Sequence, residues 1–123
     1  MIAPKEKGMK LLVIGSRSIR NFDISPYVPA DTDMIISGGA VGIDTIAEAY
    51  ADKHRLSKLI LRPAYGRYGR AAPLKRNEAM IREADSILVI WDGVSKGTYH
   101  SIQHAEKLGK NISVIIAAAK EDR

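Results

Sequence analysis

Five short apolar runs recur along this chain, and each is nearly continuous in Ile, Leu and Val rather than alternating with polar residues. The runs are KLLVIGS at 10–16, DMIISGG at 33–39, KLILRP at 58–63, SILVIWD at 86–92 and NISVIIAA at 111–118. Continuous apolar runs of this length are typical of strands that are buried on both faces, as in a parallel sheet. The pattern therefore predicts five such strands.

Between these runs, apolar residues recur at spacings of three and four, which is the period of an amphipathic helix. This period covers residues 43–55, 73–84 and 98–109. Pro73 suits the first turn of the second helix, because its missing N–H would have no acceptor there. Residues 22–31 contain two prolines and are expected to form a loop or one short helical turn.

Strands that alternate with helices predict an α/β fold, here a single Rossmann-like three-layer α/β/α sandwich with a mostly parallel sheet of about five strands. We expect one domain over residues 1–123 with its core at about 10–118, because no repeat or low-complexity tract interrupts the pattern. In sheets of this kind, ligands bind at the carboxyl ends of the strands. The functional residues are therefore expected in the loops that follow the apolar runs.

The composition is that of an ordinary folded protein, with 46% hydrophobic and 27% charged residues. The absence of cysteine excludes disulfides and thiolate zinc sites, and it fits a cytoplasmic location. The longest apolar run, VIIAAA at 114–119, is far shorter than the roughly 20 residues that cross a bilayer, so no membrane partner is expected. The net charge of +5 suits an anionic partner without identifying nucleic acid.

Two glycine-rich loops each lie between an apolar run and a helix: SGGAVGID at 37–44 and DGVSKGT at 92–98. Residues without side chains let backbone N–H groups approach an anion, and the start of the following helix adds a positive dipole. Either loop alone is also explained as a tight turn, but two at one sheet edge favour a pair of phosphate sites. Asp44 is most simply a capping and dipole residue of its helix. Neither loop matches the ATPase phosphate loop or the dinucleotide fingerprint of dehydrogenases.

The residues expected to bind a ligand lie in these two loops, after the first apolar run and near the start of the 73–84 helix. Arg17 and Arg76 would add positive charge toward a phosphate. Ser16, Asn77 and Asp92 would orient a ribose or a base. The full set is Gly15, Ser16, Arg17, Ser37, Gly38, Gly39, Ala40, Gly42, Asp44, Arg76, Asn77, Asp92, Ser95, Lys96, Gly97 and Thr98.

Two other groups of residues suggest different chemistry. His100 and His104 are four apart on one helical face, a spacing found in metal pairs, but no third ligand is evident, so we expect neither a metal nor another cofactor. Tyr65 and Tyr68 lie in the stretch RPAYGRYGR at 62–70. Their rings could stack on a nucleobase or on single-stranded nucleic acid, or they could cover the sheet edge.

Four separated motifs resemble those of the SLOG superfamily: GSR at 15–17, SGGAVGID at 37–44, RNEAM at 76–80 and SKGT at 95–98. The chain is most similar to the small stand-alone YspA- and YpsA-related members, over about residues 10–118. This Rossmann-like superfamily also contains DNA-processing protein A, which binds single-stranded DNA, and the "lonely guy" phosphoribohydrolases. The resemblance implies a nucleotide-binding crevice, and it is compatible with a homo-oligomer.

The chain departs from the phosphoribohydrolases after Gly97 and Thr98, where those enzymes carry catalytic glutamates and this chain has Tyr99, His100 and Ser101. No catalytic residue is therefore assigned. We expect a sensor or accessory protein that binds a nucleotide or a nucleotide-derived small molecule similar to ADP-ribose. Two alternatives stay open: a nucleoside 5′-monophosphate phosphoribohydrolase, and single-stranded nucleic-acid binding as in DNA-processing protein A.

Overall fold

The computed structural model describes residues 8–117, and the five apolar runs form five strands there. The strands are β1 (Met9–Gly15), β2 (Thr32–Ser37), β3 (Ser57–Ile60), β4 (Ser86–Trp91) and β5 (Asn111–Ile116). All neighbouring strands pair in parallel, in the order β3-β2-β1-β4-β5. The prediction of one parallel five-stranded sheet is confirmed.

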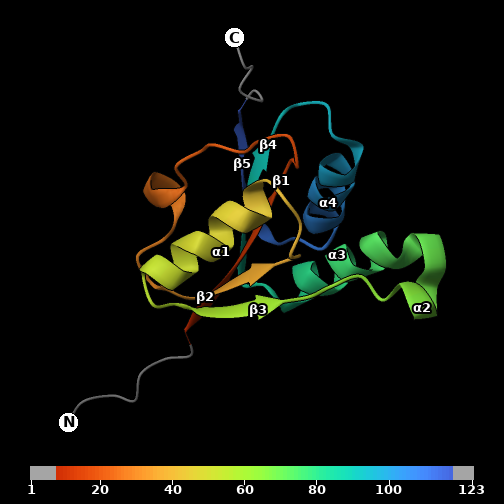
Figure 1. Ribbon diagram of the computed structural model, residues 1–123, viewed down its shortest axis with the longest axis horizontal. Coiled ribbons are helices and arrows are strands. Elements are labelled where there is room, and N and C mark those ends of the chain that lie inside the picture. The colour runs from red at the N-terminus through yellow and green to blue at the C-terminus, as the bar shows by residue number, and fades with distance from the viewer. Residues whose placement is uncertain (1–7, 118–123) are drawn as a thin grey trace.

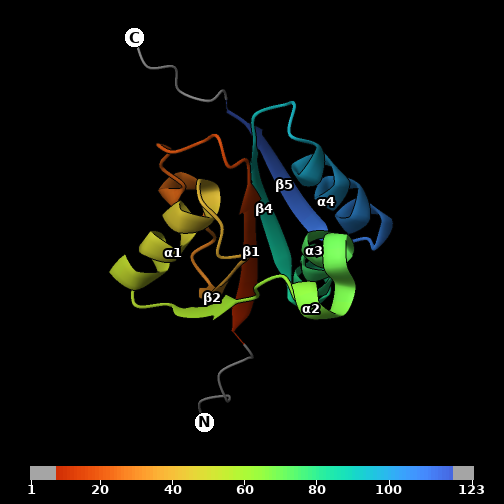
Figure 2. The ribbon, with the colours of Figure 1, turned by 45° about the vertical axis from the view of Figure 1, so that its right-hand side comes forward.

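Helices cover both faces of this sheet and make three layers (Figure 1, Figure 2). One face carries α1 (Ile43–Lys53), and the other carries α3 (Ala72–Glu83) and α4 (Lys96–Lys107). Their positions agree with the three helical periods in the sequence. The chain therefore has the expected Rossmann-like α/β/α architecture.

Short helical segments occur in two of the connections. The segment η1 (Ser25–Tyr27) is the single helical turn expected between β1 and β2. The segments α2 (Tyr65–Tyr68) and η2 (Gly69–Ala71) fall where the sequence indicates only a loop. Neither segment buries a side chain, so the sequence shows no helical period of apolar residues there. The α2 segment projects beyond the end of α3 (Figure 1).

Two apolar clusters, one on each face of the sheet, hold the layers together. Leu11 and Val13 of β1 point toward α1, while Leu12 and Ile14 point toward α3 and α4, and all four are buried. Full burial of one such side chain contributes about 1.5–3 kcal/mol to the free energy of folding. Because β1 is packed on both faces, its carboxyl end and the loop that follows are fixed between two layers.

The direction of the strand order reverses between β1 and β4. The chain runs from β1 outward to β2 and β3, then crosses back to β4 and runs outward to β5. The connection after β1 leads to the α1 face, and the connection after β4 leads to the α3 and α4 face. Diverging loops at such a reversal leave a crevice between them, and ligands of open α/β sheets bind there.

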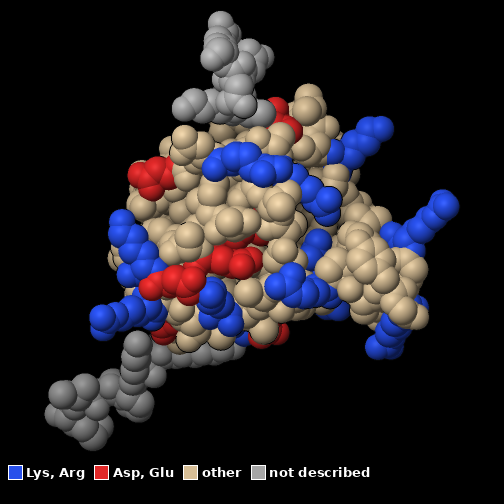
Figure 3. Space-filling view, in the orientation of Figure 1, with Lys and Arg blue, Asp and Glu red and all other residues tan. Residues whose placement is uncertain are grey.

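The charged side chains on the surface of the described residues do not form a pattern that identifies a partner. Acidic side chains gather over α1 on the face shown in Figure 3, while Lys and Arg side chains are scattered, several of them on the side that carries α2. This face has no continuous basic track of the kind that follows a polynucleotide backbone. Within residues 8–117, no helix is both long enough and apolar enough to span a bilayer.

Candidate functional site

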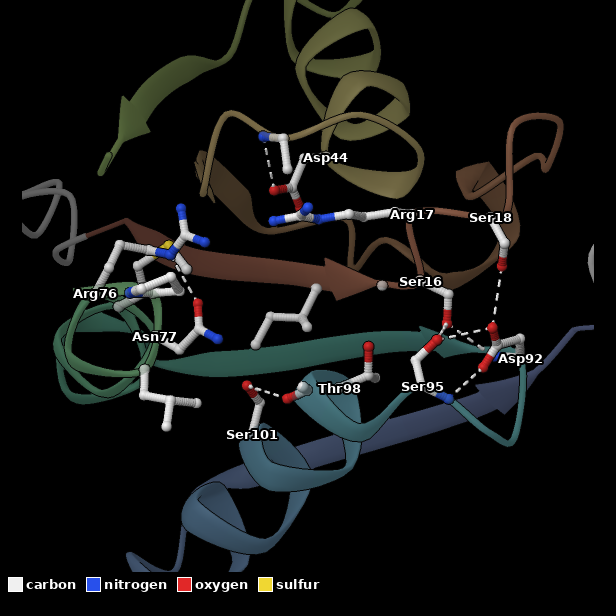
Figure 4. Close-up of a pocket in the computed structure, with 17 residues that line it drawn as sticks. Ser16, Arg17, Ser18, Asp44, Arg76, Asn77, Asp92, Ser95, Thr98 and Ser101 are labelled. Carbon is white, nitrogen blue, oxygen red and sulfur yellow. Dashed lines mark hydrogen bonds between the residues drawn. The ribbon is translucent and has the colours of Figure 1, made fainter. Parts of the chain in front are cut away.

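A cavity of about 500 Å³ lies at the carboxyl ends of β1 and β4, at the reversal point of the sheet. Its walls come from the loop after β1, the loop before α4, the first turns of α4, one face of α3 and the start of α1 (Figure 4). Most residues expected to bind a ligand line it, namely Gly15, Ser16, Arg17, Ala40, Asp44, Arg76, Asn77, Asp92, Ser95, Gly97 and Thr98. Those outside its lining are Ser37, Gly38, Gly39, Gly42 and Lys96.

Six further residues line the cavity without having been expected there: Ile14, Ser18, Pro73, Leu74, Met80 and Ser101. A signal for some of them was present in the sequence. Pro73 and Met80 lie three or four residues from the predicted pair Arg76 and Asn77, on the same face of α3, and Ser101 follows Thr98 by three on α4. Extending each motif along its helical face would have found them.

The loop after β4 is organised by the carboxylate of Asp92. Its Oδ1 accepts hydrogen bonds from the N–H groups of Val94 and Ser95, at 2.9 and 2.8 Å, and its Oδ2 accepts from the hydroxyls of Ser95 and Ser18, at 2.7 and 3.0 Å. These bonds, led by the one from the Val94 N–H, hold the pKa of Asp92 far below its ordinary value. A carboxylate has about four acceptor positions, and here all are used. Its contacts therefore assign Asp92 to loop structure rather than to a ribose.

Helix α4 begins at the edge of the cavity, which Gly97 and Thr98 of its first turn line. Its N-cap residue, Ser95, makes no side-chain capping bond, because its hydroxyl donates to Asp92 and lies 3.1 Å from the Ser16 hydroxyl. The first N–H groups of a helix have no acceptor within the helix. Gly97 lies in this first turn, and a Cβ added to it would meet no atom within 4 Å. The start of α4 therefore offers exposed donors and the positive end of the helix dipole.

Two polar side chains that line the cavity make no hydrogen bond within residues 8–117. Thr98 is 6% exposed, its hydroxyl makes no hydrogen bond there, and Figure 4 shows it pointing into the cavity. The guanidinium of Arg17 makes no hydrogen bond or ion pair with the described residues, and it extends toward Asp44 (Figure 4). The hydroxyl and the first-turn amides form a set of donors suited to a phosphate at the start of α4, and Arg17 adds positive charge to the same cavity.

The first glycine-rich loop, which follows β2, is closed on itself instead. The Gly39 N–H donates to the Ser37 hydroxyl at 3.2 Å, and the Ala40 N–H donates to Asp44 Oδ2 at 3.1 Å. The Ser37 hydroxyl in turn donates to Glu48 Oε2 at 2.7 Å. Two amides expected to hold a phosphate are thus already bonded to side chains of the protein.

Close packing accounts for the glycines of this loop. A Cβ on Gly38 would lie 2.6 Å from Arg76 Nη1, and a Cβ on Gly42 would lie 2.7 Å from the backbone of the loop after β1. Arg76 Nη1 donates to the carbonyl oxygens of Gly38, at 2.6 Å, and Leu61, at 3.1 Å. Burial lowers the pKa of this arginine. Arg76 therefore holds the loop in place from the cavity side. The loop directs a carbonyl oxygen toward the Arg76 guanidinium, and it does not direct amide N–H groups toward an anion.

Asp44 stands in the cavity wall formed by the start of α1. Burial raises the pKa of its carboxyl above the ordinary value, although Arg76 and Arg17 act in the opposite direction. Its Oδ2 accepts from Ala40, and its Oδ1 has no hydrogen-bond partner among the described residues. A carboxyl with a raised pKa in a cavity is a frequent mark of a functional site. The interpretation of Asp44 as a simple capping residue misses this environment, which side chains distant in sequence create.

The remaining wall is apolar and is formed by Ile14, Pro73, Leu74 and Met80. Asn77 stands on the same face of α3, and its Oδ1 accepts from Arg76 Nε at 2.7 Å. This bond directs the carbonyl of the amide to the arginine and leaves the NH₂ group to face other partners. An apolar wall with one amide group suits a flat heteroaromatic ring.

Two other predicted groups lie outside the cavity. His100, on α4, has its Nε2 3.9 Å from Glu78 Oε2 on α3, and residues 8–117 contain no cluster of three or more His, Asp or Glu side chains that could hold a metal. Tyr65 and Tyr68 are exposed on α2, with the Arg67 guanidinium 5.1 Å from the centre of the Tyr68 ring. The arginine–tyrosine stretch therefore forms a separate surface.

Comparison of the chain with protein-family models, with curated proteins and with solved structures gives no match. What the cavity binds is therefore inferred from its own geometry and chemistry.

Proposed function

We propose that the cavity binds a nucleotide or a nucleotide-derived small molecule, similar to ADP-ribose, with a phosphate at the start of α4. The observation that carries this proposal is the open first turn of α4, where Ser95 is drawn away from capping and Gly97 and Thr98 face the cavity. Helix starts of this kind bind anions, because their amides point outward and the dipole favours negative charge. Arg17, whose guanidinium extends toward Asp44 in the same cavity, adds positive charge that favours an anionic ligand.

The rest of the cavity supports a nucleotide rather than a free phosphate. Its volume of about 500 Å³ falls within the range of about 300–1,000 Å³ that is usual for small-molecule sites. The apolar wall of α3 suits a base, and Asn77 offers an amide to the edge of that base. The position at the strand reversal is where ligands of this class of fold bind. Of the two glycine-rich loops, only the second, residues 92–98, binds phosphate in this proposal.

A thermal-shift experiment tests the proposal. The purified protein is heated with adenosine 5′-monophosphate, ADP-ribose, NAD or a short single-stranded DNA, at about 50 and 200 mM salt. A ligand that binds only the folded state raises the melting temperature. We expect stabilisation by nucleotides at both salt concentrations. Stabilisation by DNA alone, and only at low salt, would favour the nucleic-acid function instead.

A matched pair of variants locates the binding. Thr98 and Thr45 each occupy the third position of a helix, but Thr98 lines the cavity, whereas Thr45 lies outside the lining and its hydroxyl donates to the Ala40 carbonyl. We expect Thr98→Val to fold normally and to bind the nucleotide about tenfold or more weakly, because a hydrogen bond to a charged group is lost. Thr45→Val should keep wild-type affinity. Equal affinity in wild type and Thr98→Val would contradict a phosphate at this position.

A second candidate function, hydrolysis of the N-glycosidic bond of a nucleoside 5′-monophosphate, is favoured by Asp44. A carboxylate can stabilise the oxocarbenium-like transition state of this reaction. The chain lacks the glutamate that the resemblance implies after Thr98 on α4, but Asp44 places a carboxylate in the opposite wall of the cavity. Water would add to C1′ of the ribose, and the base would leave with a proton. The test is chromatography of adenosine 5′-monophosphate after incubation with the protein. Free adenine and ribose 5-phosphate, absent with Asp44→Asn, would establish the activity.

A further inference from the structure

Resting on the proposed function, we infer that Asp44 recognises the ribose hydroxyls of the bound nucleotide and so selects ribonucleotides over deoxyribonucleotides. The sequence indicates Ser16, Asn77 and Asp92 for this role, whereas Asp44 is among the residues expected to bind a ligand without a role beyond capping its helix. The hydrogen bonds of the folded chain lead to a different assignment.

Two carboxylates line the cavity, and they differ in how many donors they already have. Asp92 accepts four hydrogen bonds, three from its own loop and one from the Ser18 hydroxyl in the loop after β1, and it has no position left for a ligand. Asp44 accepts one, from the Ala40 N–H, and its second oxygen has no partner among the described residues. Of the two, Asp44 is therefore the one that can accept hydrogen bonds from a bound molecule.

The surroundings of Asp44 make such a bond favourable. A carboxylate removed from water is destabilised unless donors replace the lost solvent, and the raised pKa of Asp44 is the mark of that unmet need. Hydroxyl groups of a ligand would supply the missing donors without adding charge. A phosphate would not, because it carries negative charge and accepts rather than donates hydrogen bonds.

The arrangement of the walls fixes which part of the nucleotide faces Asp44. Asp44 belongs to α1 and Thr98 to α4, on opposite faces of the sheet, and Figure 4 shows them on opposite sides of the cavity. With the phosphate at α4 and the base against the apolar wall of α3, the sugar between them faces the remaining wall. Adjacent 2′ and 3′ hydroxyls can donate to one carboxylate, and a deoxyribose loses one of those donors.

Calorimetric titration tests the assignment with adenosine 5′-monophosphate, its 2′-deoxy and 3′-deoxy forms, and guanosine 5′-monophosphate. The variant is Asp44→Asn, whose amide oxygen can still accept from Ala40. The control is Asp52→Asn, which removes the same charge from the exposed end of the same helix, where Asp52 pairs with Lys58 at 2.7 Å. Thermal unfolding of both variants confirms that they are folded.

In the wild type we expect at least one deoxynucleotide to bind about ten- to a hundredfold more weakly than the ribonucleotide, as for loss of a hydrogen bond to a charged group. In Asp44→Asn the difference should shrink to a few-fold, and in Asp52→Asn it should persist.

Equal binding of all sugars by the wild type would overturn the assignment of Asp44 and leave the proposed function standing. The assignment would also be overturned if the sugar preference survives in Asp44→Asn, or if Asp44→Asn changes only the preference between the adenine and guanine nucleotides. Either outcome would leave the proposed function standing. If the wild type binds no nucleotide at all, the proposed function fails and this inference fails with it.

Discussion

Replacing Gly42 by alanine should destabilise the fold and disturb the cavity at the same time. Gly42 has φ +82° and ψ −129°, and a Cβ at this position would lie 2.7 Å from Arg17 Cα, from the Arg17 carbonyl oxygen and from the Ser16 carbonyl oxygen. All three are backbone atoms, so no side chain can rotate away. The loop after β1, which carries Ser16 and Arg17 into the cavity, would have to move.

Gly69 provides a matched control for this substitution. Its backbone has φ +55° and ψ −129°, close to that of Gly42, but a Cβ there would meet no atom within 4 Å. A non-glycine residue in such a conformation costs about 1–3 kcal/mol, and this cost is common to both variants. Overpacking against fixed neighbours adds about 1–3 kcal/mol, at Gly42 only. We expect Gly69→Ala to lower the free energy of unfolding by about 1–3 kcal/mol and Gly42→Ala by about 2–6 kcal/mol.

Urea denaturation of both variants and the wild type measures the difference, with the dependence on denaturant checked for a common slope. Gly42→Ala should also bind a nucleotide more weakly than Gly69→Ala, because only Gly42 contacts the loop that carries Arg17. If the two variants lose equal stability, the contact between the loops after β1 and β2 is not as described. If Gly42→Ala binds as tightly as Gly69→Ala, Arg17 is not part of the ligand site.

Three further substitutions test individual parts of the site. Asp92→Ala removes the acceptor that organises the start of α4, and should lower the free energy of unfolding by about 1–2 kcal/mol. Because the pKa of Asp92 is depressed in the folded state, the stability that its carboxylate contributes is present at neutral pH and is lost as the pH falls below about 3.9. The urea curves of the variant and the wild type should therefore converge in acid. A difference that stays constant with pH would contradict this. Because folding raises the pKa of Asp44, the free energy of unfolding of the wild type should fall as the pH rises from the pKa of an ordinary aspartate through the raised pKa of Asp44. Asp44→Asn should therefore melt at a higher temperature than the wild type at pH 7, and a lower melting temperature would count against a desolvated carboxylate. Arg76→Met leaves the carbonyl oxygens of Gly38 and Leu61 without their donor and should cost about 2–4 kcal/mol in urea denaturation, whereas unchanged stability would refute the bracing role.

The fold was predictable because each strand is buried by residues on both of its faces. Leu11 to Ile14 are all buried, two toward each layer, so β1 appears in the sequence as an unbroken apolar run. The α1, α3 and α4 helices each bury one face and therefore show the helical period. The α2 segment buries no side chain, so its sequence shows no apolar periodicity.

The candidate site was predictable in location but not in its hydrogen bonds. The rule that ligands bind at the carboxyl ends of parallel strands led to Arg17, Thr98 and their neighbours, which do line one cavity. Which glycine-rich loop faces that cavity with open amides could not be foreseen, because the partner of Gly38 is Arg76, 38 residues further along the chain. Both loops have similar glycine spacing, and only the folded contacts distinguish a braced turn from an open helix start.

The most direct test of the account is the backbone amide spectrum of the ¹⁵N-labelled protein during titration with adenosine 5′-monophosphate. Amides that donate to a phosphate shift as the site fills. We predict large shifts for Gly97 and Thr98 at the start of α4, and small ones for Gly39 and Ala40, whose N–H groups are already bonded within their own loop. Large shifts confined to Gly39 and Ala40, or none in either loop, would contradict a phosphate site at the start of α4.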